Sequence, residues 1–449
     1  MLLRNEVSIS DLWSINEDQL TNTITSQQYI EGGFQFSFIL KIADTLRKNI
    51  SIQIDLCSFT NDRVGIVSTF VIEHPKGPLF SKVVYLSGFC TKKKKSIFVK
   101  TDLSLTELIK DGFISPDTHN LNIHINLKSV KQVLPNIGHF STIPNMREIT
   151  AALLSDHKIS STCTLSINDI NWICAASSNI MLKQPTLLDL DVPLVIVGDI
   201  VGQYCDLIRI FKQFGFPGIG NYLFLGNYSG SGSDGVDTLL LLLAFKILYP
   251  NNIFLLRGDH ESEGETHVKS FYEECARKKV PYTSFTSVFN SMPIAAVIGK
   301  KIFCVHAGIS PTLQSIDDVH MWGRPAPIPP CGIIHDFLFS NENANVPYYS
   351  LDLRDNTLVF GPKALQDFID SFGYELVVKG NQCVNEGFSF PFGKQLLISL
   401  YSASGIFGGN SGAVMIVGQE MEYSFFTYKP LTNEETQNFF HTDYTAEIL

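Results

Sequence analysis

Polar residues stand within four positions of the ends of four short apolar stretches of the chain, each with the composition of a buried β-strand. A single Asp at the end of a strand is more often a turn residue than a ligand. Four polar strand ends in succession are harder to dismiss, because α/β folds place their chemistry at the carboxyl ends of their strands. The pattern therefore predicts a functional site at this edge of a sheet. The polar ends, each with the stretch it follows, are Asp199 after 194–197, Asn227 after 222–225, Asp259 and His260 after 253–256, and His306 after 301–305.

The loops that carry these residues resemble the three signatures of the phosphoprotein phosphatase (PPP) family, the relatives of protein phosphatases 1 and 2A and of calcineurin. The family motifs G-D-x-H-G, G-D-x-V-D-R-G and G-N-H-E correspond here to 198–202 (GDIVG), 226–232 (GNYSGSG) and 258–261 (GDHE). The resemblance covers residues 146–430 and includes 214–217 (FGFP), 292–296 (MPIAA), 309–311 (ISP) and 402–403 (SA). It implies an α/β metallophosphoesterase fold with two central β-sheets flanked by helices.

The resemblance also implies a mechanism. In the family, two metal ions generate a hydroxide that attacks a phosphoserine or phosphothreonine in line. Arginines hold the phosphate, and a histidine oriented by a carboxylate protonates the leaving oxygen. A member that kept every motif residue would be a Ser/Thr protein phosphatase.

Several metal positions depart from the family pattern. Asp199 and His306 match metal ligands, but the histidine that should follow Asp199 is Val201, which has no donor atom. The bridging aspartate is Asn227, and an uncharged amide with one acceptor oxygen bridges two cations poorly. The remaining two positions of the second metal are changed as well: the asparagine is Asp259 and the last histidine is Asn381, in 379–382 (KGNQ) where the family reads R-A-H-Q.

The groups around the metals have changed too. His260 matches the general acid, but Gly230 stands where its orienting aspartate belongs, which predicts an unoriented acid. One phosphate arginine is Ser231, whereas Arg354 matches the other. The loop 404–409 (SGIFGG) is shorter than its counterpart in the family. The alternative for the kept residues is simple inheritance, with Asp199 capping a loop and the histidines and Arg354 satisfied as ordinary polar groups.

These losses favour a pseudophosphatase that acts as a protein-binding scaffold or regulator. Losing even an outer-shell partner of a metal costs about 10–100-fold, and three ligand positions, Val201, Asn227 and Asn381, have lost their imidazole or carboxylate here. We therefore expect no two-metal centre, and either no metal or one weakly bound divalent ion of the Mn or Fe/Zn type. The enzymatic alternative is a weakly active, single-metal phosphatase that uses Asp259, His306 and the amide oxygens of Asn227 and Asn381. A purely structural role is disfavoured by the kept Arg354 and His260.

A hydrophobic groove remote from the metals binds short Val-x-Phe motifs in protein phosphatase 1. The resemblance implies the same groove here, because the matching positions are all apolar or aromatic. The alternative is that they are ordinary core or half-buried strand residues. These positions are Ile302, Leu376, Met415, Met421, Tyr423 and Phe425.

The first 128 residues have a different pattern. Residues 50–56 and 121–127 alternate strictly between apolar and polar, and 34–42, 64–72, 82–86 and 96–99 are further candidate strands. Many short strands at this spacing predict an antiparallel β-sandwich. The segments 13–15 (WSI), 26–36 and 112–117 resemble the MATH (TRAF-like) domain, usually a peptide-binding module; an unrelated sandwich is the alternative. A linker is predicted at 129–145, the phosphoesterase-like domain at 146–430 and a tail at 431–449.

Composition limits the partners. The formal net charge of −10 over 449 residues argues against a nucleic-acid binder. The lysine run at 92–95 is expected to be a solvated hairpin tip. Nine scattered cysteines without a C-x-x-C pair indicate a reduced compartment, cytoplasmic or nuclear. No signal peptide or membrane span is predicted, since the longest apolar run, 239–245, is too short. The expected partners are proteins.

Overall fold

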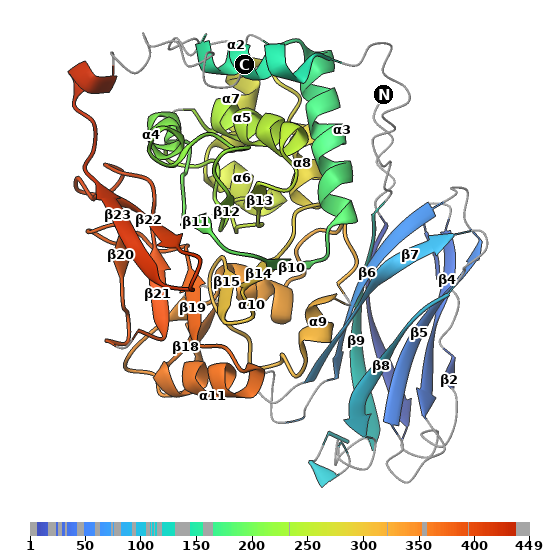
Figure 1. Cartoon of the computed structure of the whole chain (residues 1–449). Helices are drawn as coiled ribbons and strands as arrows, with labels where there is room; N and C mark the ends of the chain where they lie inside the picture. The colour runs from blue at the N-terminus through green and yellow to red at the C-terminus, as the bar shows by residue number, and fades with distance from the viewer. Residues whose placement is uncertain are drawn as a thin grey trace. The chain divides into compact units, whose positions relative to one another are not determined.

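The protein is described by a computed structural model (Figure 1). The structure describes residues 7–16, 24–25, 29–31, 34–42, 49–58, 63–72, 75, 82–91, 96–104, 108, 110–111, 113–114, 119–130, 144–155, 165–232, 234–320, 322–352, 357–393 and 395–436. The chain divides into two compact units, one of Met1–Val133 with Met321–Gly332 and one of Leu134–His320 with Ile333–Leu449.

The N-terminal unit contains two antiparallel sheets. One has the order β1-β9-β6-β7, and the other has the order β2-β4-β5-β8, with β3 paired to β4. All six predicted strands are confirmed, and four of them are at least three residues longer than predicted. The strands are β1 (Val7–Asn16), β2 (Ile24–Thr25), β3 (Tyr29–Glu31), β4 (Phe34–Ile42), β5 (Asn49–Ser58), β6 (Arg63–Ile72), β7 (Lys82–Thr91), β8 (Ser96–Ser104) and β9 (Asn120–Val130).

The alternating pattern of this unit is explained by burial. In β9, Leu121 and Ile123 are buried while Asn122 between them is half-buried, as expected for a strand with one apolar face. The packing of the two sheets as a sandwich and the MATH-like assignment stay predictions. Residues 26, 32–33, 112 and 117, which carry part of that resemblance, lie outside the described residues, as does the lysine run at 92–95. That run joins β7 and β8, which belong to different sheets and so do not form the expected hairpin.

The described part of the second unit begins with two helices. These are α2 (Met146–Ser155) and α3 (Ile167–Lys183). Ser166 caps α3, because its side chain accepts a hydrogen bond from the Asp169 amide and donates one to the Asp169 carboxylate. Most of the predicted linker, 131–143, lies outside the described residues.

Two mixed sheets form the centre of this unit. The first has the order β10-β14-β15-β19-β21-β20, and the second has the order β13-β12-β11-β22-β23. The prediction of two central sheets is confirmed. The strands of the first sheet are β10 (Leu187–Leu190), β14 (Ala295–Ile298), β15 (Ile302–Val305), β19 (Leu376–Lys379), β20 (Phe388–Ser389) and β21 (Leu397–Leu400), and those of the second are β11 (Leu194–Val197), β12 (Tyr222–Phe224), β13 (Ile253–Leu255), β22 (Gly412–Val417) and β23 (Tyr423–Tyr428).

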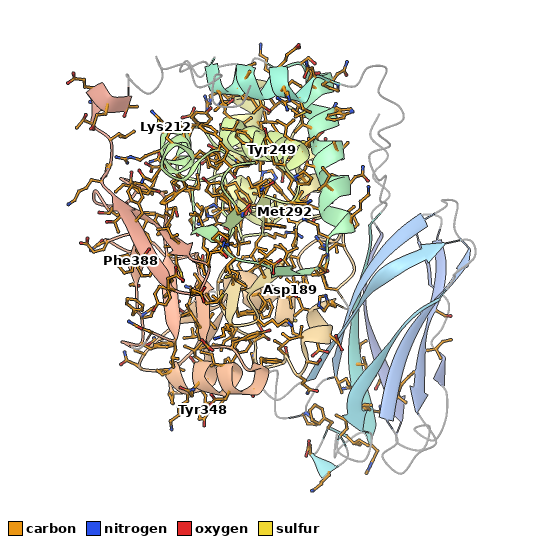
Figure 2. The ribbon with its side chains drawn as sticks, in the orientation of Figure 1. Asp189, Lys212, Tyr249, Met292, Tyr348 and Phe388 are labelled. Atoms are coloured by element: carbon orange, nitrogen blue, oxygen red, sulfur yellow. The ribbon has the colours of Figure 1, made fainter. Side chains whose placement is uncertain are left out.

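The central strands are apolar on both faces because both faces are covered. In β11, Val195 and Val197 belong to the cluster on the helix side, whereas Leu194 and Ile196 belong to the cluster between the two sheets. Side chains fill these layers (Figure 2), and Met292 is fully buried on the helix side. The helices of that side are α2, α3, α4 (Tyr204–Phe214), α5 (Gly235–Leu248), α6 (Glu263–Val268), α7 (Phe271–Lys278) and α8 (Tyr282–Phe289).

The other face of the six-stranded sheet is covered by the C-terminal helices. Phe303 of β15 contacts the rings of Phe337, Phe368 and Tyr374, which lie in or after these helices. The elements here are α9 (Ile316–His320), α10 (Ile333–Phe339), α11 (Pro362–Phe372) and a small sheet of β16 (Asn341–Glu342), β17 (Tyr349–Leu351) and β18 (Leu358–Phe360). No helix in the described parts of the chain is long and apolar enough to cross a membrane.

Candidate functional site

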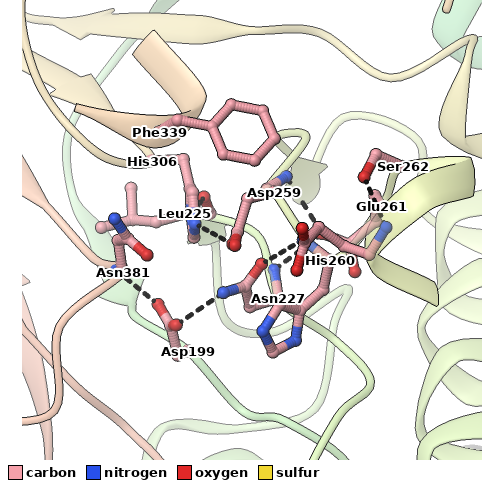
Figure 3. A network of polar contacts seen from close by, with 12 residues as sticks. Asp199, Leu225, Asn227, Asp259, His260, Glu261, Ser262, His306, Phe339 and Asn381 are labelled. Atoms are coloured by element: carbon pink, nitrogen blue, oxygen red, sulfur yellow. Dashed lines mark hydrogen bonds and ion pairs between the residues drawn. The ribbon is translucent and has the colours of Figure 1, made fainter. Parts of the chain in front are cut away.

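The predicted strand ends meet in one largely buried network of polar contacts (Figure 3), which we call the cleft. Asp199, Asn227 and Asp259 follow the parallel strands β11, β12 and β13, and His306 and Asn381 follow the parallel strands β15 and β19 (Figure 3). Parallel strands deliver their carboxyl ends to the same edge of a sheet. The five residues predicted as ligand positions are therefore brought together by the fold.

Asn227 lies at the middle of this cleft. Its Nδ2 donates to Oδ2 of Asp199 over 2.9 Å, and its Oδ1 accepts from the His260 amide over 3.0 Å (Figure 3). Its backbone φ of 56° is in the left-handed region, which Asn tolerates better than most residues. The amide side chain thus links the Asp199 loop to the 258–261 loop.

Glu261 links these loops through hydrogen bonds to their backbone, a role that the sequence did not predict. Its carboxylate accepts three backbone N–H groups, those of Asn227 at 2.8 Å, Tyr228 at 3.0 Å and Gly258 at 3.0 Å. Burial raises the pKa of Glu261 above its usual value, although these hydrogen bonds and the nearby histidines oppose the rise. The only sequence signal was its place in the 258–261 motif.

Asp259 and His306 form a close pair. We call this pair and the Leu225 carbonyl the histidine half of the cleft. His306 Nε2 lies 3.0 Å from Oδ1 of Asp259, and its Nδ1 donates to the Leu225 carbonyl over 2.9 Å. Burial alone would raise the pKa of Asp259, but the His306 hydrogen bond and the charges of His260 and His306 hold it well below its usual range. Burial alone would lower the pKa of His306, but Asp259 and the other carboxylates raise it.

Val201 lies among apolar side chains. It is buried with Tyr401 and Ala403, and Cys383, Val384 and Ile406 pack against them. We call these six residues the valine half of the cleft. Tyr401 also lies near Asp199, and burial together with the Asp199 charge raises the pKa of its hydroxyl. The position that matches a metal-binding histidine is therefore part of a small apolar cluster.

His260 is oriented, contrary to the expectation of an unoriented acid. Its Nδ1 lies 2.6 Å from the Ser229 carbonyl oxygen, which can only accept, so Nδ1 carries the proton. The ring occupies the space beside Gly230: a Cβ added there would lie 2.8 Å from Cε1 and 2.9 Å from Nδ1 of His260. A backbone carbonyl has taken the place of the missing carboxylate, and backbone carbonyls leave no signature in a sequence.

The shortened loop 404–410 is fastened to α4. Asp206 accepts hydrogen bonds from the Ser404 amide at 2.7 Å and the Ser404 hydroxyl at 3.1 Å. Asn410 closes the loop by accepting from the Phe407 amide and donating to the Ala403 carbonyl. Burial raises the pKa of Asp206 to about 6, although its bonds to Ser404 and its neighbour Arg209 oppose the rise. This loop forms part of the wall of the valine half.

Comparison with known proteins agrees with this arrangement. The family of calcineurin-like phosphoesterases matches residues 192–384 of the chain. Residues 192–384 thus have the fold of calcineurin-like phosphoesterases. The structure is similar to that of a protein serine/threonine phosphatase from Saccharomyces cerevisiae described as having similarity to human phosphatase PP5. The TM-score is 0.56 and the identity 24%, and the match covers 60% of this chain and 91% of that one.

The donor atoms of this phosphoesterase domain differ from those of a two-metal centre. Val201 supplies no donor, and Asn227 turns a donating N–H toward Asp199. Asp199 also accepts from the Asn381 backbone amide, at 2.9 Å. Within the described part of the chain, no group of three or more His, Cys, Asp or Glu side chains is arranged to hold a metal ion. Arg354, the predicted phosphate ligand, lies outside the described residues, and Ser231 is exposed.

The six predicted groove positions fall in one apolar cluster between and beside the central sheets. Ile302 and Leu376 are direct partners in the β15–β19 ladder, and Met415 is the partner of Phe425 in the β22–β23 ladder. Ile302, Leu376 and Met415 are almost fully buried, as core residues would be. The half-buried members are Met421, Tyr423 and Phe425.

Proposed function

We propose that this protein is a pseudophosphatase, a Ser/Thr phosphatase-like protein that works by binding other proteins. The observation that carries the proposal is the apolar packing of Val201 with Tyr401 and Ala403. In the family, this position would provide an imidazole for the first metal. A valine enclosed by apolar side chains can neither bind a cation nor lower the pKa of a water molecule.

The expected metal content is none or one weakly bound divalent ion. The alternative function, a weakly active single-metal phosphatase, is favoured by the histidine half, where Asp259 and His306 still provide two groups of the types that bind metals. The two functions differ in what the valine half can contribute. A two-metal hydrolase needs donors there, and a binding protein does not.

Metal content and turnover test this proposal together. The protein would be purified in excess manganese, dialysed and measured by elemental analysis, and its hydrolysis of a phosphothreonine peptide compared with that of an active family member. We expect at most one metal ion per chain and activity at least about a thousandfold lower, because the ligand losses compound. Two tightly held ions, or turnover near the usual enzyme median of about 10 per second, would overturn the proposal.

We further propose that partners bind as extended peptides along β23. Among the described strands, β23 pairs only with β22, so its outer edge is available for a further strand. Tyr423 and Phe425 are half-buried on one face of β23, and Phe425 stacks on Phe388 with ring centroids 3.9 Å apart. Anchor side chains buried on this face would contribute about 1.5–3 kcal/mol each.

A matched pair of variants tests this surface. Phe425 and Phe426 are neighbours on β23, but their side chains point to opposite faces of the sheet, because Phe426 contacts Phe214 on the helix side. With a synthetic Val-x-Phe peptide and fluorescence anisotropy, we expect Phe425→Ala to weaken binding at least tenfold and Phe426→Ala to leave it unchanged. Equal losses in both variants would mean that only the stability of the sheet had been measured. Leu376 is unsuitable for this test because it is buried in the core.

The N-terminal β-structured unit is proposed as a second protein-binding module. We also propose a cytoplasmic or nuclear location. In support, the six cysteines whose side chains the structure describes are all free: Cys174, Cys205, Cys275, Cys304, Cys331 and Cys383.

A further inference from the structure

The side-chain amide of Asn227 forms hydrogen bonds through both its N–H and its oxygen, and these bonds link two loops of the cleft. One end donates to the Asp199 carboxylate over 2.9 Å, and the other accepts from the His260 backbone over 3.0 Å. Both Asn227 and Asp199 are 1% exposed, so neither group can turn to solvent instead. An amide is the side chain that can satisfy a buried acceptor and a buried donor at the same time.

A carboxylate could not do the same at position 227. It would place an oxygen where Nδ2 stands, about 2.9 Å from Oδ2 of Asp199. Two buried carboxylates at that distance cannot both be ionised unless a proton or a cation lies between them. The family solution, an aspartate at this position, therefore requires the metal that the aspartate bridges.

Gly380 provides independent support for a rebuilt cleft. The family motif has an alanine there, whereas a Cβ added to Gly380 would lie 2.4 Å from Oδ1 of Asp199. The same oxygen accepts the Asn381 amide at 2.9 Å. The Asp199 carboxylate thus occupies space that the Cβ of an alanine at position 380 would fill. In this position it accepts hydrogen bonds from two N–H groups.

We propose that Asn227 structurally replaces the bridging cation, so that the phosphoesterase domain folds and keeps its cleft closed without any metal. The residues at the positions of the two-metal centre do not fit two cations, because a hydrogen-bonded amide links the Asp199 loop to the 258–261 loop. This inference deepens the proposed function, in which the cleft is not catalytic. It predicts one specific reversal: restoring the aspartate should make the stability of the domain dependent on divalent cations.

The test is thermal unfolding of the full chain after dialysis against EDTA, repeated with added manganese or zinc. Wild-type protein should unfold at the same temperature in all three conditions. Asn227→Asp should unfold at least about 2–4 °C lower than wild type in EDTA, because the carboxylate introduced at position 227 repels the carboxylate of Asp199. Manganese or zinc should restore most of the lost unfolding temperature in the variant and should leave the unfolding temperature of the wild type unchanged.

A reciprocal variant distinguishes this tie from general damage. In Asp199→Asn combined with Asn227→Asp, the amide and the carboxylate exchange places. The new amide at position 199 can then accept from the Asn381 backbone and donate to the new carboxylate at position 227, whose other oxygen accepts from the His260 amide. Part of the lost unfolding temperature should return in EDTA; full recovery is not expected, because the Asn227 side chain also hydrogen-bonds Asp259.

If Asn227→Asp failed to fold in EDTA, recovery of soluble protein by the double variant would support the same conclusion. An Asn227→Asp variant as stable as wild type in EDTA would overturn the inference, as would a wild-type unfolding temperature that rises with manganese. A double variant no better than Asn227→Asp would also overturn it. These unfolding measurements need no enzymatic activity. A failure of this inference can therefore be distinguished from a failure of the proposed function, which the turnover assay tests.

Discussion

In the valine half of the cleft, Val201, Tyr401 and Ala403 pack as core residues, whereas in the histidine half Asp259 and His306 form a paired acid and base. Residues of both halves match metal positions in the phosphatase motifs that the sequence resembles. One half is an apolar cluster and the other contains a buried hydrogen-bonded pair, with Asn227 between them. The comparison shows that neighbouring positions of one set of motifs can be held by two unrelated kinds of contact.

The largest expected effect comes from breaking the histidine half. Asp259→Ala removes one partner of a largely buried pair and leaves His306 facing an empty site. Breaking such a pair costs about 3–5 kcal/mol. We therefore expect the free energy of unfolding in urea to fall by that amount. Val201→Ala is the control in the other half and should cost less, since it deletes two methyl groups from a small cluster. Equal costs would mean that the two halves do not differ in kind.

The wall of the valine half should be sensitive to pH through Asp206. Its pKa is about 6 in the folded state, because of burial, against an ordinary value near 3.8. Between these values the folded state binds more protons than the unfolded state, so stability is highest below pH 4 and falls as the pH rises through 6. At about 1.4 kcal/mol per pH unit, the loss relative to Asp206→Asn is about 3 kcal/mol.

The measurement for this second prediction is urea unfolding of both proteins between pH 4 and 7.5. Asp206→Asn keeps an oxygen that can accept from Ser404 but has no charge to bury. Its stability should therefore rise relative to wild type as the pH increases over this range. A constant difference between the two proteins would show that the Asp206 carboxylate is not desolvated.

The sequence predicted which residues meet in the cleft better than it predicted what they do there. Asp199, Asn227 and His306 could be placed because strand ends converge and the motifs have fixed spacing. The surroundings of Val201 could not be foreseen, since Tyr401 and Ala403 come from a strand end two hundred residues away. The orientation of His260 depends on the Ser229 carbonyl, which any residue type would provide.

The predicted groove positions illustrate the same limit of sequence-based prediction. The matched positions do gather in one cluster, as the family resemblance implied. Their side-chain burial differs, however, and it separates Ile302, Leu376 and Met415 in the core from Met421, Tyr423 and Phe425 at its margin. Apolar residue types alone cannot distinguish a buried strand residue from one at an open edge.

A smaller effect is expected from restoring the ligand to the valine half. Val201→His places a polar ring in an apolar cluster at a backbone φ of 42°, and we expect a loss of about 1–3 kcal/mol. The variant should gain no tightly bound metal, because Asn227 still directs its N–H toward Asp199. Calorimetric titration with zinc checks this, with wild type as the reference. Tight binding by the single variant would mean that the valine half had kept the geometry of a metal site.

The smallest expected effect concerns Gly230, which lies between His260 and Val201. An added Cβ would meet the His260 ring at 2.8 Å and the Val201 Cβ at 3.3 Å, and the φ of 153° is unfavourable for any other residue. Gly230→Ala should therefore displace His260 from the Ser229 carbonyl, at a cost of about 1–2 kcal/mol. The readout is the ring N–H proton of His260 in NMR spectra. Hydrogen-bonded in the wild type, it should exchange slowly; in Gly230→Ala its signal should broaden or vanish. Ser231→Ala, at an exposed neighbouring position, should leave the signal intact. If the signal survived in Gly230→Ala, the lack of a Cβ at position 230 could not be what allows His260 to reach the Ser229 carbonyl.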